Sequence, residues 1–340
     1  MVEEARQRKA SPSAPSRSYP NKRNRCDNGA IPAEANQASA SSSDSTKLLE
    51  AFRAFRDEID SHNDRRERLI KSSRDVTSLS KKVIFLLHRF DIHDFASETP
   101  SNKTRKLFSE AETKLEEIVA LLRQAAAAEG LGSIQTQQEQ LDASTKRLTS
   151  QRYERNIGGG LEEFIEAISF YHYLRTTRLI SLSQIQDRFR TDPVPESHFY
   201  SPLSSQAISA SQPPASDSST LVALHIPTHR YLLGLSDLTG ELMRFATNAV
   251  GQGDTGAVIK QVLSLTRQLR DGLDPFVPLV RDLNKKQSVT NQSLRKIEDI
   301  LYAITVRSAE YGSDPKALQE MVRRTLASSS SAQNSSDDVD

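Results

Sequence analysis

Apolar side chains recur at intervals of three and four residues along most of the chain, which is the spacing that gathers them on one face of an α-helix. No proline or glycine interrupts this pattern between residues 45 and 95, which predicts either one very long helix or two helices with a break near residues 75–80. The two-residue alternation of β-strands is missing from the sequence, so we expect an all-α fold, a single-domain bundle of about six or seven helices. Further helices are predicted over residues 104–128, 151–180, 231–249, 255–272 and 283–309, and residues 134–150 show the same spacing with a weaker apolar face.

Three segments lack the apolar side chains that a folded core requires. Residues 1–44 form a basic tail rich in Ser, Pro, Ala and Asn, residues 181–222 form an insert rich in Ser and Pro, and residues 327–340 are almost entirely polar. Such segments cannot bury enough apolar surface to offset the entropy lost on ordering, so we expect all three to be disordered. The helical domain is therefore predicted to span residues 45–326, interrupted by the insert.

The charge balance and the cysteine content exclude several classes of protein. With 45 Lys and Arg residues against 44 Asp and Glu, the chain has no overall field that would attract a polyanion, so a nucleic-acid site has to be local. Cys26 is the only cysteine, which excludes a disulfide framework and a thiolate metal cluster. The sequence has no apolar run of the roughly 20 residues that cross a bilayer and no apolar core of a secretory signal. We therefore expect an intracellular protein with no membrane contact.

The N-terminal tail carries a basic group in the stretch NKRNR, formed by Lys22, Arg23 and Arg25. Such groups serve as nuclear localisation signals, and they also occur in tails that are simply solvated. On the first interpretation, the protein is expected in both the cytoplasm and the nucleus.

One predicted helix carries carboxylates among apolar neighbours. In LEEFIEAISFYHYL, residues 161–174, Glu163 and Glu166 share a face with Phe170, and the other faces are apolar. A helix that is apolar nearly all round is expected to be buried, so these glutamates should lie in an interior or against a partner. We interpret the glycines of NIGGGL, residues 156–161, as a flexible lead-in to this helix, because no strand precedes them to form a nucleotide loop.

A second predicted helix, residues 231–250, has a polar stripe where a surface helix would have a broad polar face. Asp237, Glu241 and Arg244 stack at intervals of three and four residues, and leucines cover most of the remaining surface. Burying an isolated carboxylate costs several kcal/mol unless it is paired or bound to a metal. The carboxylates of the two helices are therefore expected to meet each other, a cation, or both.

Two interpretations of these carboxylates stay open on the residues alone. Hard oxygen ligands suit Mg²⁺, with Mn²⁺ as a substitute, and a bound divalent ion activates water for hydrolysis of a phosphodiester. A di-iron site would require Glu-x-x-His motifs, but Ser169 and Arg244 stand where the histidines would be. In the alternative, the carboxylates only form salt bridges with Arg244 and its neighbours, and the chain is a non-catalytic scaffold. The candidate catalytic and metal-binding residues are Glu163, Glu166, Asp237 and Glu241.

Basic residues crowd the first long helix and offer contacts to nucleic acid. Acidic neighbours partly balance them, so a solvated charged face is the alternative. A single strand would enter a cavity between helices more readily than a duplex. The candidate nucleic-acid-binding residues are Lys71, Arg74, Lys81, Lys82 and Arg244.

Four segments carry a resemblance to known proteins. They are FRAFRDEIDSHNDRRERLIKSSRDVTSLSKKVIFLLHRF (52–90), GGLEEFIEAISFYHYL (159–174), YLLGLSDLTGELMRFATNAVGQGD (231–254) and SLRKIEDILYAITVRSAE (293–310). In this order they resemble the translin family, and among its members the subunits that associate with translin. DLTGELMR is the most specific piece, and the similarity spans about residues 47–310.

The resemblance implies an all-α subunit that assembles with translin into a hollow hetero-octameric shell. It also implies a Mg²⁺-dependent endoribonuclease that cleaves single-stranded RNA, including passenger strands in the RISC pathway and precursor-tRNA fragments. The Glu-x-x-Glu pair of the family falls on Glu163 and Glu166, and its Asp-x-x-x-Glu pair falls on Asp237 and Glu241. The stretch IPTHR before Tyr231 departs from the family, which has an acidic residue there.

The expected function is therefore that of the catalytic subunit of a translin-type, hetero-oligomeric endoribonuclease. Translin is the expected partner, and single-stranded RNA or single-stranded DNA is the expected ligand. The alternative is a helical scaffold, or a nucleic-acid-binding partner of translin, that does not cleave.

Overall fold

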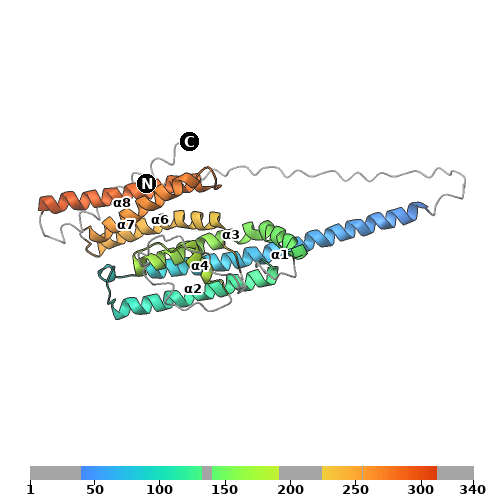
Figure 1. The fold of residues 1–340 in the computed structure, drawn as a ribbon, viewed down its shortest axis with the longest axis horizontal. Helices are drawn as coiled ribbons and strands as arrows, with labels where there is room; N and C mark the ends of the chain where they lie inside the picture. The colour runs from blue at the N-terminus through green and yellow to red at the C-terminus, as the bar shows by residue number, and fades with distance from the viewer. Residues whose placement is uncertain (1–39, 132–139, 191–223, 255, 312–340) are drawn as a thin grey trace, which may run out of the picture. The chain divides into compact units, whose positions relative to one another are not determined.

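The computed structural model describes residues 40–131, 140–190, 224–254 and 256–311, which form α-helices and short 3-10 helices (Figure 1). Within these ranges there is no β-strand, which confirms the predicted all-α fold. The elements are α1 (Ala40–Leu87), η1 (Ile92–Asp94), α2 (Asn102–Glu129), α3 (Gln140–Thr176), α4 (Leu182–Asp187), α6 (Thr228–Gly251), α7 (Ala257–Leu273), η2 (Asp274–Phe276) and α8 (Leu283–Tyr311).

The chain divides into two compact units, Met1–Asp57 and Glu58–Asp340, and the boundary falls within α1. In the described part of the first unit, residues 40–57, the apolar stripe predicted from the spacing is exposed. Its four large side chains are between 56% and 61% exposed. Within this unit the described residues form only one helix, so no second element is present to cover the stripe. The stripe consists of Leu48, Leu49, Phe52 and Phe55.

In the second unit, helices lie side by side around a common core (Figure 1). Helix α6 packs against α3, α7 and α8, and α3 also packs against α2. Helix α3 is buried on several faces, as predicted, with Phe164, Phe170 and Tyr171 at most 1% exposed. The two central helices, α3 and α6, carry the predicted carboxylates.

The sequence left open whether the first segment forms one very long helix or two helices. The structure shows one helix, because α1 continues through residues 75–80 without a break. It ends at Leu87 and does not reach residue 95. The side chain of Asp91 accepts a hydrogen bond from the backbone N–H of His93 and starts the 3-10 turn η1. Asp side chains that bond to nearby backbone in this way compete with a continuing helix.

The prediction for NIGGGL is wrong, since these glycines lie inside α3 and do not lead into it. The backbone N–H of Gly160 donates a hydrogen bond to Ser73 Oγ on α1 at 3.0 Å. A Cβ atom at position 160 would lie 2.9 Å from the backbone oxygen of Ser73, closer than atoms pack. Gly160 is therefore required for the close approach of two helices, and not for flexibility.

The predicted disordered insert, residues 181–222, begins too early, because α4 lies within it. Ser181 and Gln184 form a reciprocal capping box at the start of α4. Gln186 then joins α4 to the chain beyond the insert, because its side chain donates to Leu224 O at 2.6 Å and accepts from Ile226 N–H at 2.9 Å.

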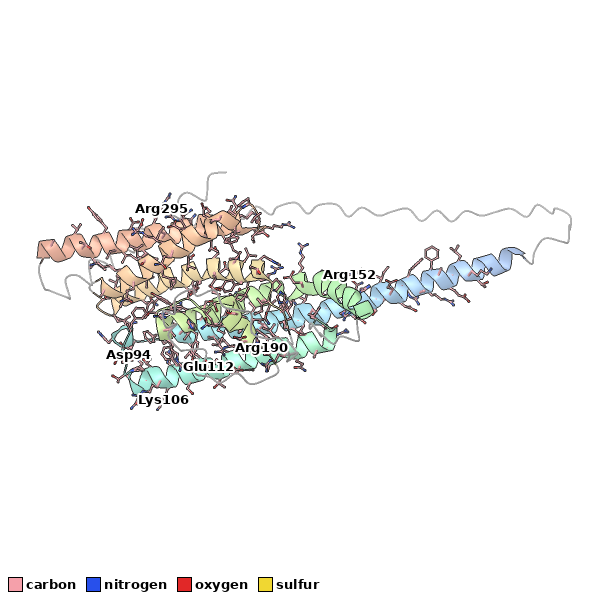
Figure 2. The ribbon with its side chains drawn as sticks, in the orientation of Figure 1. Asp94, Lys106, Glu112, Arg152, Arg190 and Arg295 are labelled. Atoms are coloured by element: carbon pink, nitrogen blue, oxygen red, sulfur yellow. The ribbon has the colours of Figure 1, made fainter. Side chains whose placement is uncertain are left out.

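Helix α4 is also tied to α2. The side chain of Arg188 donates to Glu112 at 2.7 Å and to Glu116 at 2.8 Å, in the region where Figure 2 labels Glu112 and Arg190. Residues 181–190 therefore belong to the helical unit. The rest of the predicted insert, residues 191–222, lies outside the described residues.

The predicted N-terminal tail also ends too late, because α1 begins at Ala40 and not at residue 45. The remainder of that tail, with its basic group Lys22, Arg23 and Arg25, lies outside the described residues, as do residues 312–340. Across the part of the chain that the structure describes, no helix combines the length and the apolar character needed to cross a bilayer.

Candidate active site

The contact between α3 and α6 positions the predicted carboxylates. Gly234 of α6 makes this contact close, since a Cβ atom there would lie 2.7 Å from Cγ2 of Ile165 and 2.9 Å from the backbone oxygen of Glu162. Asp237 follows Gly234 by one helical turn, so it is carried toward the acidic segment of α3. A small residue on α6 thus determines how near the two acidic stripes can come.

Glu166 is the centre of the acidic group. Its residue is 9% exposed, and no side chain among the described residues donates a hydrogen bond to its carboxyl group. Burial, and then the negative charges of Asp237, Glu241 and Glu163, raise the pKa of Glu166 to about 9. The charges of the other three residues that the sequence selected therefore act on Glu166, and burial together with these charges favours its protonated form.

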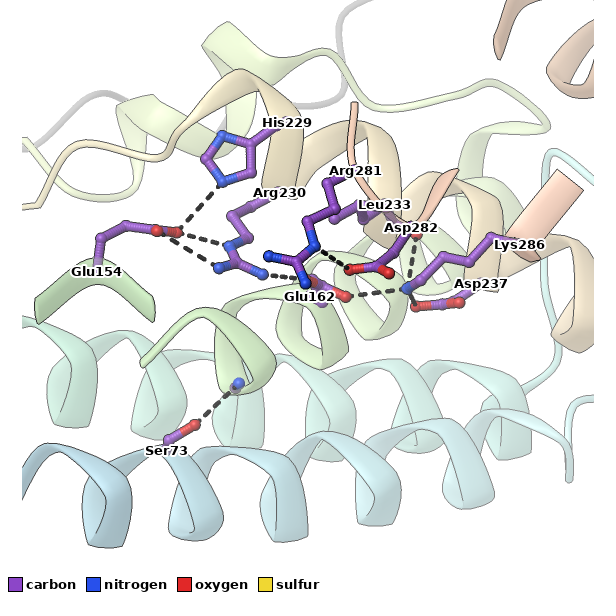
Figure 3. A network of polar contacts seen from close by, with 11 residues as sticks. Ser73, Glu154, Glu162, His229, Arg230, Leu233, Asp237, Arg281, Asp282 and Lys286 are labelled. Carbon is purple, nitrogen blue, oxygen red and sulfur yellow. Dashed lines mark hydrogen bonds and ion pairs between the residues drawn. The ribbon is translucent and has the colours of Figure 1, made fainter. Parts of the chain in front are cut away.

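Asp237 is paired with a lysine from α8. Lys286 Nζ lies 2.5 Å from Asp237 Oδ2 and 2.9 Å from Glu162 Oε2, between the two carboxylates (Figure 3). Burial raises the pKa of Asp237, although Lys286 opposes this effect. Burial acts to lower the pKa of Lys286, but the two carboxylates outweigh it, and the net effect is a raised pKa. Lys286 is thus a charged group held at the edge of the acidic cluster.

The same network extends along α3 through Arg230. The guanidinium of Arg230 binds Glu162, and its Nε donates to Glu154 Oε1 at 2.6 Å (Figure 3). Gly158 leaves the room that this guanidinium occupies, because a Cβ atom there would collide with it. The glycines of α3 therefore serve both the helix packing and the ion-pair network.

The two remaining carboxylates are paired with cations from other positions. Lys81 Nζ on α1 lies 3.3 Å from Glu163 Oε1. Glu241 is bound by Arg244 Nη1 at 2.9 Å and by the imidazole Nε2 of His88. The side chains of Lys81 and Arg244 are each 65% exposed, so solvent screens these two pairs, whereas the His88 side chain is 15% exposed.

The donor set of the site suits a hard divalent ion. Carboxylate oxygens are the ligands that Mg²⁺ and Mn²⁺ prefer. Glu166 is buried among three other carboxylates, an arrangement whose repulsion a divalent cation would offset. In the side-chain positions seen here, no three His, Cys, Asp or Glu groups within the described ranges are close enough together to hold a metal. Metal binding would therefore require the carboxylates to turn away from Lys286, His88 and Lys81.

The sequence analysis did not select three residues of this site, Lys286, His88 and Glu162. Lys286 is separated from Asp237 by 49 positions and from Glu162 by 124 positions, and His88 is separated from Glu241 by 153 positions. Glu162 carried a usable signal, because it is the third acidic residue in one turn of an apolar helix. No local pattern marks Lys286 or His88.

The candidate nucleic-acid-binding residues fall into two groups. Lys71, Arg74 and Lys82 are exposed on α1. Lys81 and Arg244 lie at the rim of the acidic cluster and pair with Glu163 and Glu241, as described above. Helix α1 thus carries both exposed basic residues and, at Lys81, one that is paired with a carboxylate of α3.

Other arginines of α1 have a structural role. Arg65 Nε and Arg68 Nε donate to the carboxylate of Glu129, at 2.9 Å and 2.7 Å. The Glu129 side chain is 6% exposed at the end of α2, and its pKa is lowered by the hydrogen bond from Arg68 and by the positive charge of both arginines. These two arginines are consequently engaged in joining α1 to α2.

The sequence matches the family described as "Translin family" over residues 64–308. It is 34% identical to Translin-associated protein X of Rattus norvegicus over 278 residues, which cover 79% of this chain and 82% of the relative. It is 25% identical to the Translin-associated protein X homolog of Schizosaccharomyces pombe, over 77% of this chain and 90% of the relative. Among solved structures, the crystal structure of apo-NeC3PO is similar with a TM-score of 0.47 and 15% identity, covering 74% of this chain and 96% of that chain.

Proposed function

The chain belongs to the translin family, and on this premise we propose that it is the catalytic subunit of a hetero-oligomeric endoribonuclease that cleaves single-stranded RNA with Mg²⁺ or Mn²⁺. Glu163, Glu166, Asp237 and Glu241 are the proposed metal ligands and catalytic residues. Passenger strands of RISC and precursor-tRNA fragments are the proposed RNA classes, and the cytoplasm and nucleus are the proposed compartments.

The observation that carries this proposal is the environment of Glu166. Glu166 is 9% exposed, and burial, followed by the negative charges of Asp237, Glu241 and Glu163 from the same two helices, raises its pKa to about 9. An arrangement that is costly for the folded state is typical of functional sites. Structural ion pairs alone would not require a fourth carboxyl group that no cation contacts.

The residues around the cluster have separable roles in this proposal. A divalent ion bound by the carboxylates would lower the pKa of a water molecule and neutralise charge on the scissile phosphate. The Glu163 side chain is 27% exposed, whereas Glu166 is buried and would have to lose its proton to act as a metal ligand. Lys81 and Arg244 flank the cluster and would hold backbone phosphates after releasing their carboxylates.

We propose a translin-type chain as the partner in the assembly, because the relatives of this chain bear the name Translin-associated protein X. The exposed apolar stripe at the start of α1 is compatible with a protein that associates with another chain. Single-stranded DNA is proposed as a second ligand, because the phosphate contacts of Lys81 and Arg244 do not depend on the 2′-hydroxyl group.

One set of contacts favours a second function, a scaffold or nucleic-acid-binding partner that does not cleave. Asp237, Glu163 and Glu241 each already have a cation from the protein itself, namely Lys286, Lys81 and Arg244. If those ion pairs persist in solution with a divalent ion present, the carboxylates are structural. The two functions differ in metal dependence, which makes them separable by experiment.

The deciding measurement is cleavage of an end-labelled single-stranded RNA by this chain co-expressed with a translin-type partner, in Mg²⁺ and in EDTA. We expect cleavage in Mg²⁺ only, and its loss in Asp237→Ala. The matched control is Asp75→Ala, at an exposed position of α1. Cleavage that survives in an assembled Asp237→Ala complex would exclude Asp237 from the catalytic site. An assembled wild-type complex that never cleaves would support the scaffold function.

A further inference from the structure

Phe85 is an exposed aromatic residue in the part of α1 that packs on the bundle. Its residue is 77% exposed, although its neighbours Ile84, Leu86 and Leu87 are at most 8% exposed. A single exposed apolar side chain is common on protein surfaces and requires no explanation by itself. Phe85 is a candidate ligand-binding residue because of where it lies on α1 relative to the residues that contact the acidic cluster.

Phe85 lies between two side chains of α1 that touch the acidic cluster. Lys81 precedes it by four residues and contacts Glu163, and His88 follows it by three residues and contacts Glu241. Side chains three and four residues apart are neighbours on a helix surface, with Cβ atoms about 5–6 Å apart. Phe85 therefore lies on the same side of α1 as two residues that contact the candidate active site.

The charged residues next to Phe85 on α1 itself are all basic, although Lys81 is paired with Glu163 of α3. Lys81, Lys82 and Arg89 are exposed within four residues of Phe85, and residues 76–90 contain no Asp or Glu. The nearest neighbours of Phe85 on the helix surface are thus cations, whereas the centre of a protein interface is depleted in lysine. This combination disfavours a protein partner as the group that covers the ring.

An exposed aromatic ring among cations is an arrangement by which proteins bind single-stranded nucleic acid. The ring stacks on an unpaired base, and the cations contact the flanking phosphates. Bases in a duplex are stacked on each other and have no free face to offer. Phe85 would therefore select single strands without reading their sequence.

We propose that Phe85 stacks on an unpaired base of single-stranded RNA next to the scissile phosphate, and that Lys82 and Arg89 bind the adjoining phosphates. This inference rests on the proposed function in that RNA is the ligand. Beyond the proposed function, the inference assigns to Phe85 the distinction between single-stranded and duplex RNA.

The protein contains no tryptophan, so Phe85→Trp introduces a single fluorescent reporter at this position. The full-length variant is titrated in EDTA, which prevents cleavage, with a single-stranded RNA oligonucleotide and with the same sequence as a duplex. We expect the single strand to quench the tryptophan and the duplex to leave it unchanged. The matched control is Tyr302→Trp on α8, an aromatic position that is 71% exposed.

Affinity gives a second readout. Phe85→Ala should weaken binding of the single strand by about tenfold, in line with the loss of one stacked base, and leave duplex binding unchanged. Phe85→Tyr should retain the affinity, and Tyr302→Ala should not alter it. Equal affinity of wild type and Phe85→Ala for the single strand would overturn the proposal.

Two other outcomes are informative. If Phe85→Ala prevents assembly with a translin-type partner and leaves RNA affinity unchanged, the ring belongs to a protein interface and the stacking proposal fails. If Phe85 contributes to RNA binding in EDTA but the assembled wild type never cleaves in Mg²⁺, the endoribonuclease proposal fails and the stacking role stands. The two failures are therefore distinguishable.

Discussion

Lys286 Nζ lies 2.5 Å from Oδ2 of Asp237 and occupies one side of a carboxylate that we assign to a metal site. The lysine comes from α8 and the aspartate from α6, so the ion pair joins two helices that pack together. A divalent ion and an ammonium group compete for the same carboxylate oxygen. Lys286 is therefore expected to hold Asp237 in place without a metal and to oppose metal binding.

Replacing Lys286 with Met should increase the affinity of the full-length chain for Mn²⁺ by about tenfold, because a competing positive charge is removed at similar side-chain volume. Isothermal titration calorimetry measures this affinity directly and does not require activity. The control is Lys285→Met at the adjacent exposed position, which should leave the affinity unchanged. A lower Mn²⁺ affinity in Lys286→Met would mean that the lysine orients the metal ligands.

Glu166 should make stability depend on pH in the metal-free protein. Its pKa is about 9 when folded and about 4.5 when unfolded, so the folded state binds more protons between these values. The contribution of Glu166 to the free energy of unfolding is therefore fully present below pH 4.5, and it is lost as the pH rises from 4.5 to 9. Glu166→Gln should match wild type near pH 4.5 and be more stable by about 2 kcal/mol or more at pH 8.

Urea unfolding in EDTA at several pH values tests this expectation. Glu117→Gln, at an exposed position of α2, should change the free energy of unfolding by less than about 0.5 kcal/mol at every pH. An equal pH dependence in wild type and Glu166→Gln would show that Glu166 is ionised in the folded protein.

Two adjacent glycines of α3 should respond in opposite directions to the same substitution. Gly160→Ala should lower the free energy of unfolding by about 1–3 kcal/mol, because the added Cβ would press on the Ser73 backbone at 2.9 Å. Gly159→Ala should raise it by about 0.5–1 kcal/mol, since position 159 is exposed with no atom within 4 Å and alanine favours a helix. Chemical denaturation of both variants measures the difference, and the same sign for both would contradict the close α1–α3 contact.

The arginines of α1 should differ in how much each contributes to the stability of the fold. Arg65→Ala should destabilise the protein by about 1–2 kcal/mol, because it removes a 2.9 Å hydrogen bond to a buried carboxylate of Glu129. The same variant also loses the contact of the guanidinium with the Tyr153 ring, 4.8 Å from its centre. Arg66→Ala, at the next and exposed position, should have little effect on the melting temperature. Equal melting temperatures for the two variants would argue against the role of Glu129 in joining α1 to α2.

Local patterns were sufficient for most of the helices and for the acidic stripes that two of them carry. The helix predicted over residues 283–309 is α8, Leu283–Tyr311, and the helix predicted over 104–128 is α2, Asn102–Glu129. Helical spacing depends on nearby residues, so it can be read without knowledge of the fold. The acidic stripes of α3 and α6 were visible for the same reason, since each lies on one helix.

Local patterns failed where a distant residue decides the structure. Helix α4 was assigned to a disordered insert, because its ties from Gln186 reach Leu224 and Ile226, 38 and 40 positions away. The glycines of α3 were assigned to a flexible lead-in, because the residues that require two of them come from other helices. Gly160 meets Ser73 of α1, and Gly158 meets Arg230 of α6.

The sequence by itself determined the all-α fold, most helix boundaries and which helix faces carry acid, because these follow from short-range periodicity and composition. Only the tertiary structure decided that Lys286, Lys81 and His88 bind these carboxylates, and that Glu166 is buried near the others. The physical reason is that charge pairing and burial depend on which helices meet, and residues up to 153 positions apart meet only in the folded chain.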